Sequence, residues 1–179
     1  PRGYAHTWKS VVFGRFNHLF STLMMPVSTL KRVGLLNEEL YGPEDYEFFV
    51  RLFLDSFEGV RCIPAYIYQY RVYGSSITKQ REQYLRVLES GLKISHWLFQ
   101  HPSLPQEEKR WRSLALMDMY RYFARERIIH DQPDIARLIL KRAWSDPAIR
   151  SIHWFQEGFL LWLRSYLPAG LNGWLVDVR

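Results

Sequence analysis

The second half of the chain, from residue 80 to residue 167, carries apolar residues at helical spacing almost without interruption. Apolar side chains that recur three and four positions apart place one face of a helix in a core. We therefore predict helices over 80–100, from 107 to about 129, from Pro133 onward, and from Pro147 to 167. The predicted inward-facing residues of the first and third of these helices are Tyr84, Val87, Leu88, Leu92, Leu98, Ile135, Leu138 and Ile139.

The beginning of the chain, residues 1–78, mixes strand-like and helix-like pieces. Residues 20–26 have the composition of a strand that ends at a proline. A short helix over 29–33 follows, with Ser28 as its predicted N-cap and Gly34 as its stop.

A second helix in this region starts with Pro43 at its first position and ends at Gly59. Residues 60–72 are rich in Ile, Val and Tyr and predict a strand, with Pro64 arguing for an edge or a break. Tyr66, Tyr68 and Tyr70 would share one face of that strand, either to pack against helices or to stack on sugars. The predicted buried face of the helix consists of Phe49, Leu52, Phe53 and Phe57.

Composition excludes several classes of protein. The chain is 47% hydrophobic and 23% charged, so it can bury a core and is not disordered as a whole. A single cysteine, Cys62, excludes a disulfide framework and a zinc site made of several cysteines, and suits the reducing cytoplasm. The six histidines show no metal-ligand spacing, so we predict no metal site from them.

The net charge of +6 favours anionic partners. The basic residues are spread over several predicted helices between glutamates, which argues against a nucleic-acid-binding module. The most apolar stretch, residues 159–163, is far shorter than the ~20 residues that cross a membrane. The first residues lack the apolar segment of a signal peptide and have no starting methionine, which suggests the interior of a longer protein.

The densest chemical signal is the pair Glu44 and Asp45 in the first turn of a predicted helix. The partial positive charge of a helix N-terminus keeps a carboxylate ionised, and an ionised carboxylate within reach of a hydroxyl can act as a general base. Acidic residues also favour first turns for purely structural reasons. The two residues by themselves favour this structural interpretation.

Four segments around this pair occur in a characteristic order. They are a helix that ends in Val33-Gly34, a loop over 35–40, the acidic helix start over 42–52, and a Tyr-rich segment over 63–78. This order resembles the C-terminal half of the catalytic domain of family 2 glycosyltransferases, over roughly residues 15–80. The resemblance implies an α/β fold, mostly α in this chain: the C-terminal part of a GT-A nucleotide-diphospho-sugar transferase fold over residues 1–79, followed by a helical appendage over 80–179.

The resemblance also implies roles for individual residues. Asp45 matches the catalytic base and Glu44 its acidic neighbour, while Arg71, Tyr73 and Ser75 fall in the substrate-binding segment. Arg71 would face a phosphate or pair with a carboxylate such as Asp45 or Glu47. Many relatives have a metal-binding histidine where this chain has Tyr73, and a phenol is a poor ligand for magnesium or manganese at neutral pH.

The parent activity implied is inverting transfer of a sugar from a nucleotide-sugar donor to a glycan or lipid-linked glycan acceptor, as in polysaccharide biosynthesis for the cell envelope. The parent enzyme would use a divalent metal, magnesium or manganese, with ligands mostly outside this chain. The family's donor-binding half and its Asp-x-Asp motif have no counterpart here, so we expect the chain to be a fragment that is inactive alone. The alternative is a non-catalytic helical interaction module that retains a decayed transferase segment.

The last predicted helix has a broad aromatic and apolar face with Arg150 and Arg164 as basic flanks. Such a helix can lie in a membrane interface, which would give the protein a peripheral contact at the inner face of the membrane. Packing on the preceding helices is the other interpretation and is favoured by the residues alone.

Overall fold

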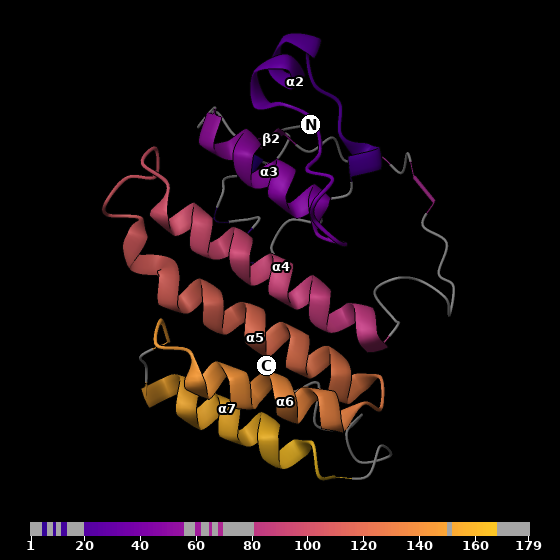
Figure 1. Cartoon of the computed structure of the whole chain (residues 1–179), viewed down its shortest axis with the longest axis vertical. Coiled ribbons are helices and arrows are strands. Elements are labelled where there is room, and N and C mark those ends of the chain that lie inside the picture. Colours follow the sequence, from indigo (N-terminus) through magenta and orange to yellow (C-terminus); the bar gives the residue numbers. More distant parts are fainter. Residues whose placement is uncertain are drawn as a thin grey trace. The chain divides into compact units, whose positions relative to one another are not determined.

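The computed structural model describes residues 20–55, 81–149 and 152–167, with short pieces at 5–6, 9, 12–13, 60–61, 65 and 68–69. The chain divides into two compact units, Pro1–Lys109 and Arg110–Arg179. Over the described residues the protein is mostly α-helical, as predicted (Figure 1). The boundary predicted at 79/80 marks the end of the family resemblance and is not a boundary between compact units. It stays a prediction.

The N-terminal unit contains three α-helices within the described residues: α2 (Val27–Val33), α3 (Glu44–Asp55) and α4 (Arg81–Gln100). Two strands of two residues each, β1 (Ala5–His6) and β2 (Val60–Arg61), pair in antiparallel fashion. The predicted strand over 60–72 is confirmed only at its first two residues. Among the later described positions, Ala65, Tyr68 and Gln69 are not in a strand, and the other positions lie outside the described residues.

The strand predicted over 20–26 is wrong. Its first residues form a single 3-10 turn, η1 (Phe20–Thr22), in which the backbone N–H of Leu23 donates to the carbonyl of Phe20 at 3.1 Å. In a β-strand, a neighbouring strand satisfies the backbone groups. Here the local turn satisfies one of them instead.

Helix α2 forms where the sequence predicts it and ends at Gly34, whose φ of +89° favours glycine. The predicted cap is wrong, because Pro26 is the N-cap residue and Ser28 lies inside the helix. Near the end of α2, Arg32 donates to both carboxylate oxygens of Asp55, the last residue of α3, at 2.8 Å. The hydrogen bond and the charge of Arg32 lower the pKa of Asp55.

Helix α3 is the core of the N-terminal unit. It begins one residue after Pro43, whose carbonyl accepts the first helical hydrogen bond from Glu47 at 3.0 Å. The burial predicted for Phe49, Leu52 and Phe53 is confirmed, whereas Phe57 and Gly59 lie outside the described residues. Burial extends around most of the helix and also includes Tyr46, Glu47, Phe48, Val50 and Leu54.

Helix α4 confirms the helix predicted over 80–100, since it spans Arg81–Gln100. Four of its five predicted inward residues are buried, namely Tyr84, Leu88, Leu92 and Leu98, and Val87 is half-buried. Helix α3 packs against α4 within the unit (Figure 1).

In the described part of the C-terminal unit, three α-helices pack side by side: α5 (Arg112–Ile129), α6 (Pro133–Ser145) and α7 (Ile152–Arg164) (Figure 1). A 3-10 turn, η3 (Lys109–Trp111), precedes α5, so the predicted start at residue 107 is too early. Helix α6 starts at the predicted proline and buries Ile135 and Ile139 as expected.

Two predictions for this unit are wrong. Leu138 is 53% exposed, because the buried sector of α6 is formed by Ala136, Ile139, Leu140 and Ala143, on the other side of the helix. The last helix does not begin at Pro147. The carboxylate of Asp146 accepts a hydrogen bond from the N–H of Ala148 at 2.9 Å and thereby closes a separate turn before α7.

Candidate functional site

The site predicted from the sequence lies at the first two positions of α3. Glu44 and Asp45 are both half-buried there. One carboxylate oxygen of Asp45 accepts a hydrogen bond from the backbone N–H of Tyr46 at 2.7 Å. For the Glu44 side chain, no hydrogen bond or ion pair occurs with the residues that the structure describes. The helix N-terminus supplies partial positive charge that stabilises both carboxylates.

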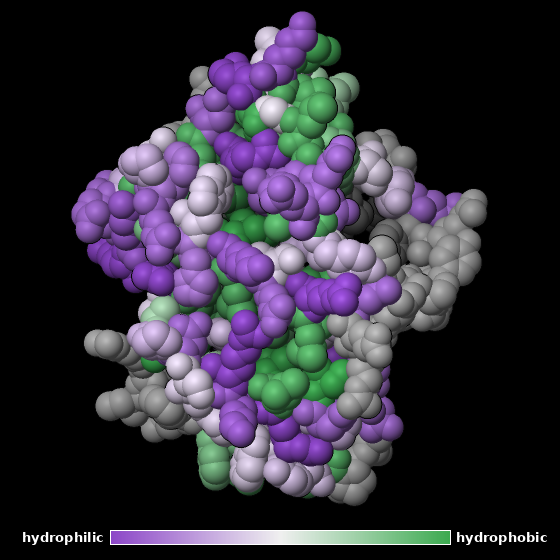
Figure 2. Space-filling view, in the orientation of Figure 1, coloured by the Kyte–Doolittle hydropathy of each residue, from purple (hydrophilic) through white to green (hydrophobic). Residues whose placement is uncertain are grey.

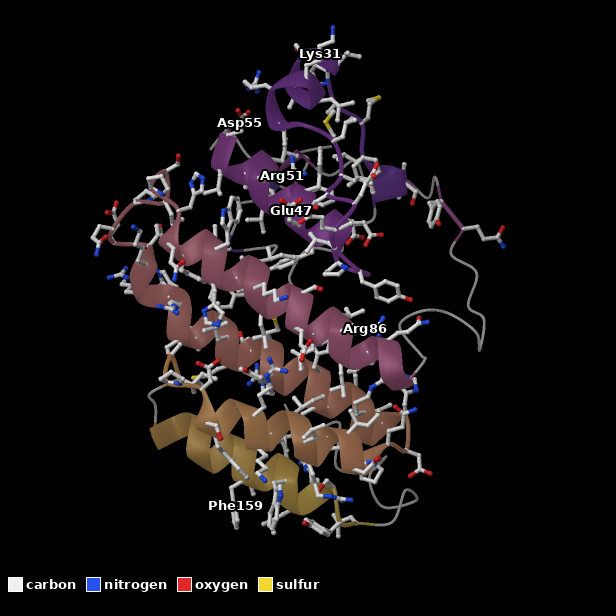
Figure 3. All side chains as sticks on the ribbon, in the orientation of Figure 1. Lys31, Glu47, Arg51, Asp55, Arg86 and Phe159 are labelled. Atoms are coloured by element: carbon white, nitrogen blue, oxygen red, sulfur yellow. The ribbon has the colours of Figure 1, made fainter. Side chains whose placement is uncertain are left out.

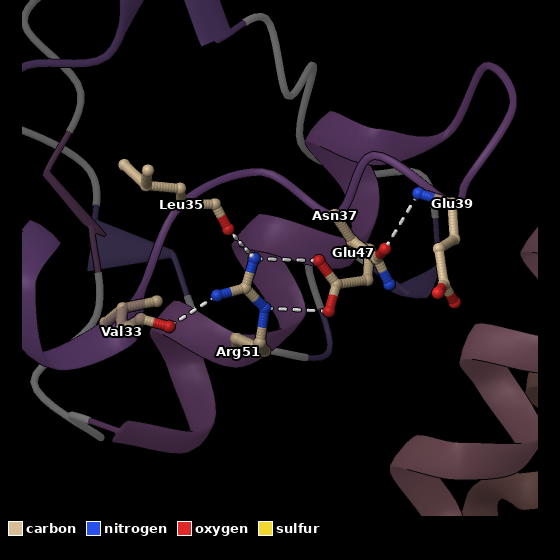
Figure 4. A network of polar contacts seen from close by, with 6 residues as sticks. All are labelled: Val33, Leu35, Asn37, Glu39, Glu47 and Arg51. Atoms are coloured by element: carbon tan, nitrogen blue, oxygen red, sulfur yellow. Dashed lines mark hydrogen bonds and ion pairs between the residues drawn. The ribbon is translucent and has the colours of Figure 1, made fainter.

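A third carboxylate of the same turn, Glu47, has a different role. Its side chain is 11% exposed and forms a two-pronged ion pair with Arg51, with nitrogen–oxygen distances of 2.7 and 2.9 Å (Figure 4). From the sequence, Glu47 is a possible partner for Arg71, whereas in the structure its partner is Arg51. The signal was present, because a Glu four residues before an Arg is the favourable order on a helix.

Arg51 also holds the chain that leads into the site. Its guanidinium donates to the carbonyl of Val33 and, at 2.6 Å, to the carbonyl of Leu35 (Figure 4). It lies 5.3 Å from the centre of the Phe48 ring, which adds a cation–π contact. Arg51 therefore ties the end of α2 and the following loop to α3.

Gly42 brings the residues before α3 against α4. Its φ is +94°, and a Cβ atom there would lie 2.6 Å from a methyl carbon of Val87. Any other residue would clash with α4 and adopt a disfavoured backbone conformation. The start of α3 is thus placed directly beside α4.

Tyr46 anchors the helix start from inside the core. Its hydroxyl and that of Ser95 in α4 are hydrogen-bonded at 3.2 Å. Burial raises the pKa of Tyr46 to about 12, although the hydrogen bond with Ser95 acts in the opposite direction. Together with Arg51 and Gly42, this contact fixes the position of the carboxylate pair on α3.

We expect the substitution Tyr46→Phe to destabilise the protein by about 1 kcal/mol near neutral pH, because the Ser95 hydroxyl loses its buried partner. The phenol's raised pKa makes the effect depend on pH. Above pH 10 the Tyr46 phenol loses its proton in the unfolded state but keeps it in the folded state, whose pKa is about 12. The contribution of Tyr46 to the free energy of unfolding is therefore complete below pH 10 and declines as the pH rises toward 12. Urea unfolding of the wild type and the variant across this range should show the variant gaining relative stability. A pH-independent difference would contradict the prediction.

The other predicted site residues cannot be placed beside this pair. Arg71, Tyr73 and Ser75 lie outside the described residues, as do Cys62, Tyr66 and Tyr70. Tyr68 is described and is 49% exposed. The roles predicted for Arg71, Tyr73 and Ser75 stay predictions.

Carboxylates are also the usual ligands of magnesium and calcium ions. No group of three His, Cys, Asp or Glu side chains that could hold an ion occurs in the part of the chain that the structure describes. Glu44 and Asp45 alone do not complete a coordination sphere. Among the same residues, no helix has the length and apolar character needed to cross a bilayer.

Comparison with known proteins identifies no relative. No family model, curated protein or solved structure matches this chain. Its function must therefore be argued from its own residues and their arrangement.

Proposed function

We propose that this chain forms the acceptor side of an inverting glycosyltransferase of the family 2, GT-A type, with Asp45 as the base. The observation that supports this proposal is the half-buried pair of Glu44 and Asp45 at the start of a buried helix. Arg51, Gly42 and Tyr46 hold that helix start in place, and a fixed carboxylate is what a general base requires.

In the proposed reaction, the Asp45 carboxylate takes the proton of an acceptor hydroxyl while that oxygen attacks the anomeric carbon of a nucleotide sugar. The bond from this carbon to the nucleotide diphosphate breaks, and the electron pair leaves with the diphosphate. Attack opposite the leaving group inverts the configuration. The N–H of Tyr46 orients Asp45.

The remaining parts of the proposal lie beyond the described residues. Arg71, Tyr73 and Ser75 would contact the donor or the acceptor. A bound divalent ion would stabilise negative charge on the leaving diphosphate, with ligands mostly outside this chain. The acceptor would be a glycan or a lipid-linked glycan, on the cytoplasmic side.

Asp45→Asn tests the proposal in a protein that joins this chain to a donor-binding half. We expect sugar transfer to fall by about 10³-fold, within the range of general-base removal, and nucleotide-sugar affinity to change less than about twofold. Glu38→Gln is the matched control, because Glu38 is an exposed carboxylate in the preceding loop. Unchanged transfer would refute the base role, and lost donor binding would move Asp45 to a structural or donor-binding role.

A second candidate function is a helical interaction module without catalysis. The observation that favours it is an apolar surface on α7 that no described residue covers. The two functions differ in their dependence on Asp45, because an interaction module would tolerate Asp45→Asn without functional loss.

A further inference from the structure

The last turns of α7 and the residues just after it have large apolar side chains on the outside. Among the side chains described there, from 158 to 167, the buried positions are Gly158, Leu161 and Ser165, which are small or polar except for one leucine. Surface helices of globular proteins normally show the opposite pattern. The exposed sector contains Phe159, Leu160, Leu163, Tyr166 and Leu167, which are 50%, 59%, 44%, 60% and 39% exposed. We call these five residues the α7 face.

Aromatic rings form a continuous row along one edge of the α7 face. Trp162 stacks on Phe159 with ring centres 6.1 Å apart and meets Tyr166 edge-on at 4.9 Å. On its other side it approaches Trp144 of α6 at 6.4 Å. Phe159 extends away from α5 and α6 (Figure 3). Trp and Tyr side chains suit the boundary between lipid headgroups and acyl chains.

A basic residue of α6 contacts this row. Arg137 of α6 donates to the carbonyl of Ser165 at 2.9 Å, and its guanidinium lies 4.7 Å from the centre of the Tyr166 ring. Arg164 is half-buried on α7 itself, and Lys141 and Arg142 are exposed on α6.

The C-terminal unit as a whole also has a net positive charge. Residues 110–179 contain 11 Lys and Arg against 7 Asp and Glu. The acidic residues of α6 and α7 are Asp134, in the first turn of α6, and Glu157. An apolar aromatic face bordered by arginine and lysine therefore complements a surface that is apolar inside and anionic outside.

We propose that the α7 face binds the surface of an anionic lipid bilayer, with the helix lying in the plane of the interface. The apolar side chains would enter the acyl boundary, while Arg137, Lys141 and Arg164 would meet lipid phosphates. This inference does not depend on the proposed transferase activity. Exposed apolar residues also occur near α2 (Figure 2), but no aromatic row with basic borders accompanies them in the described residues.

The test is flotation of the whole chain with vesicles of phosphatidylcholine and phosphatidylglycerol, compared with vesicles of phosphatidylcholine alone. The double substitution Phe159→Gln, Leu163→Gln should lower the partition coefficient on mixed vesicles by about tenfold or more. Lys141→Gln with Arg164→Gln should lower it by about tenfold on mixed vesicles and hardly at all on neutral ones. Met24→Gln is the matched control, because Met24 is 86% exposed in the N-terminal unit.

Each substituted side chain is at least partly exposed, so circular dichroism should show the variants folded. Failure of the wild-type chain to float, or equal flotation of the Phe159 and Leu163 variant, would overturn the proposal. Light scattering provides a further check. A wild-type dimer that this double substitution dissociates would instead identify the α7 face as a self-association surface and would also overturn the proposal.

Discussion

Replacing Arg51 with Met is expected to destabilise the N-terminal unit by about 3 kcal/mol, because it leaves the buried carboxylate of Glu47 without its partner. Glu47 is buried, and Arg51 supplies both nitrogens that bind it. The same substitution frees the carbonyls of Val33 and Leu35, so the loop that leads to Glu44 and Asp45 loses its attachment to α3. Urea unfolding followed by circular dichroism measures the loss.

Two further variants distinguish this effect from general damage. Adding Glu47→Gln to Arg51→Met removes the unpaired charge and should recover part of the stability. Arg32→Met breaks the exposed pair with Asp55 and should change stability little. Equal effects of Arg51→Met and Arg32→Met would show that the Arg51 network contributes no more than a surface ion pair.

The second large effect is expected at Gly42. We predict that Gly42→Ala costs about 3 kcal/mol, because the backbone there has a φ of +94° and the new Cβ would lie 2.6 Å from Val87. The collision would push α3 and α4 apart at the carboxylate pair. The measurement is again the free energy of unfolding in urea.

The two causes can be separated with Val87→Ala. Removing the methyl groups of Val87 relieves the collision but not the backbone strain. Gly42→Ala should therefore cost less stability in a Val87→Ala background than in the wild type. Additive effects of the two substitutions would rule out a steric contact between Gly42 and α4.

Local sequence patterns predicted the helices well. The 3.6-residue period predicted α4 and most of α5, and glycine and proline marked the end of α2 and the start of α6. These signals are local, because backbone conformation and one buried face depend on residues only a few positions apart.

The predictions that were wrong failed because contacts with other parts of the chain, or competing local hydrogen bonds, decided the structure. The strand predicted over 20–26 has a 3-10 turn, η1, at its start. Leu138 has the spacing of a core residue, yet the packing of α6 against α5 and α7 buries the opposite side. The predicted start at Pro147 failed because the Asp146 side chain closed a turn first.

For the candidate site, the sequence by itself determined that Glu44 and Asp45 occupy the first turn of a helix, because the proline before them and the apolar spacing after them are local signals. Only the tertiary structure decided how the start of this helix is held. It paired Glu47 with Arg51, placed Gly42 against Val87 and bonded Tyr46 to Ser95. It likewise left the α7 face outside the core, because a period identifies an apolar face but only the packing of neighbouring helices determines whether that face is covered.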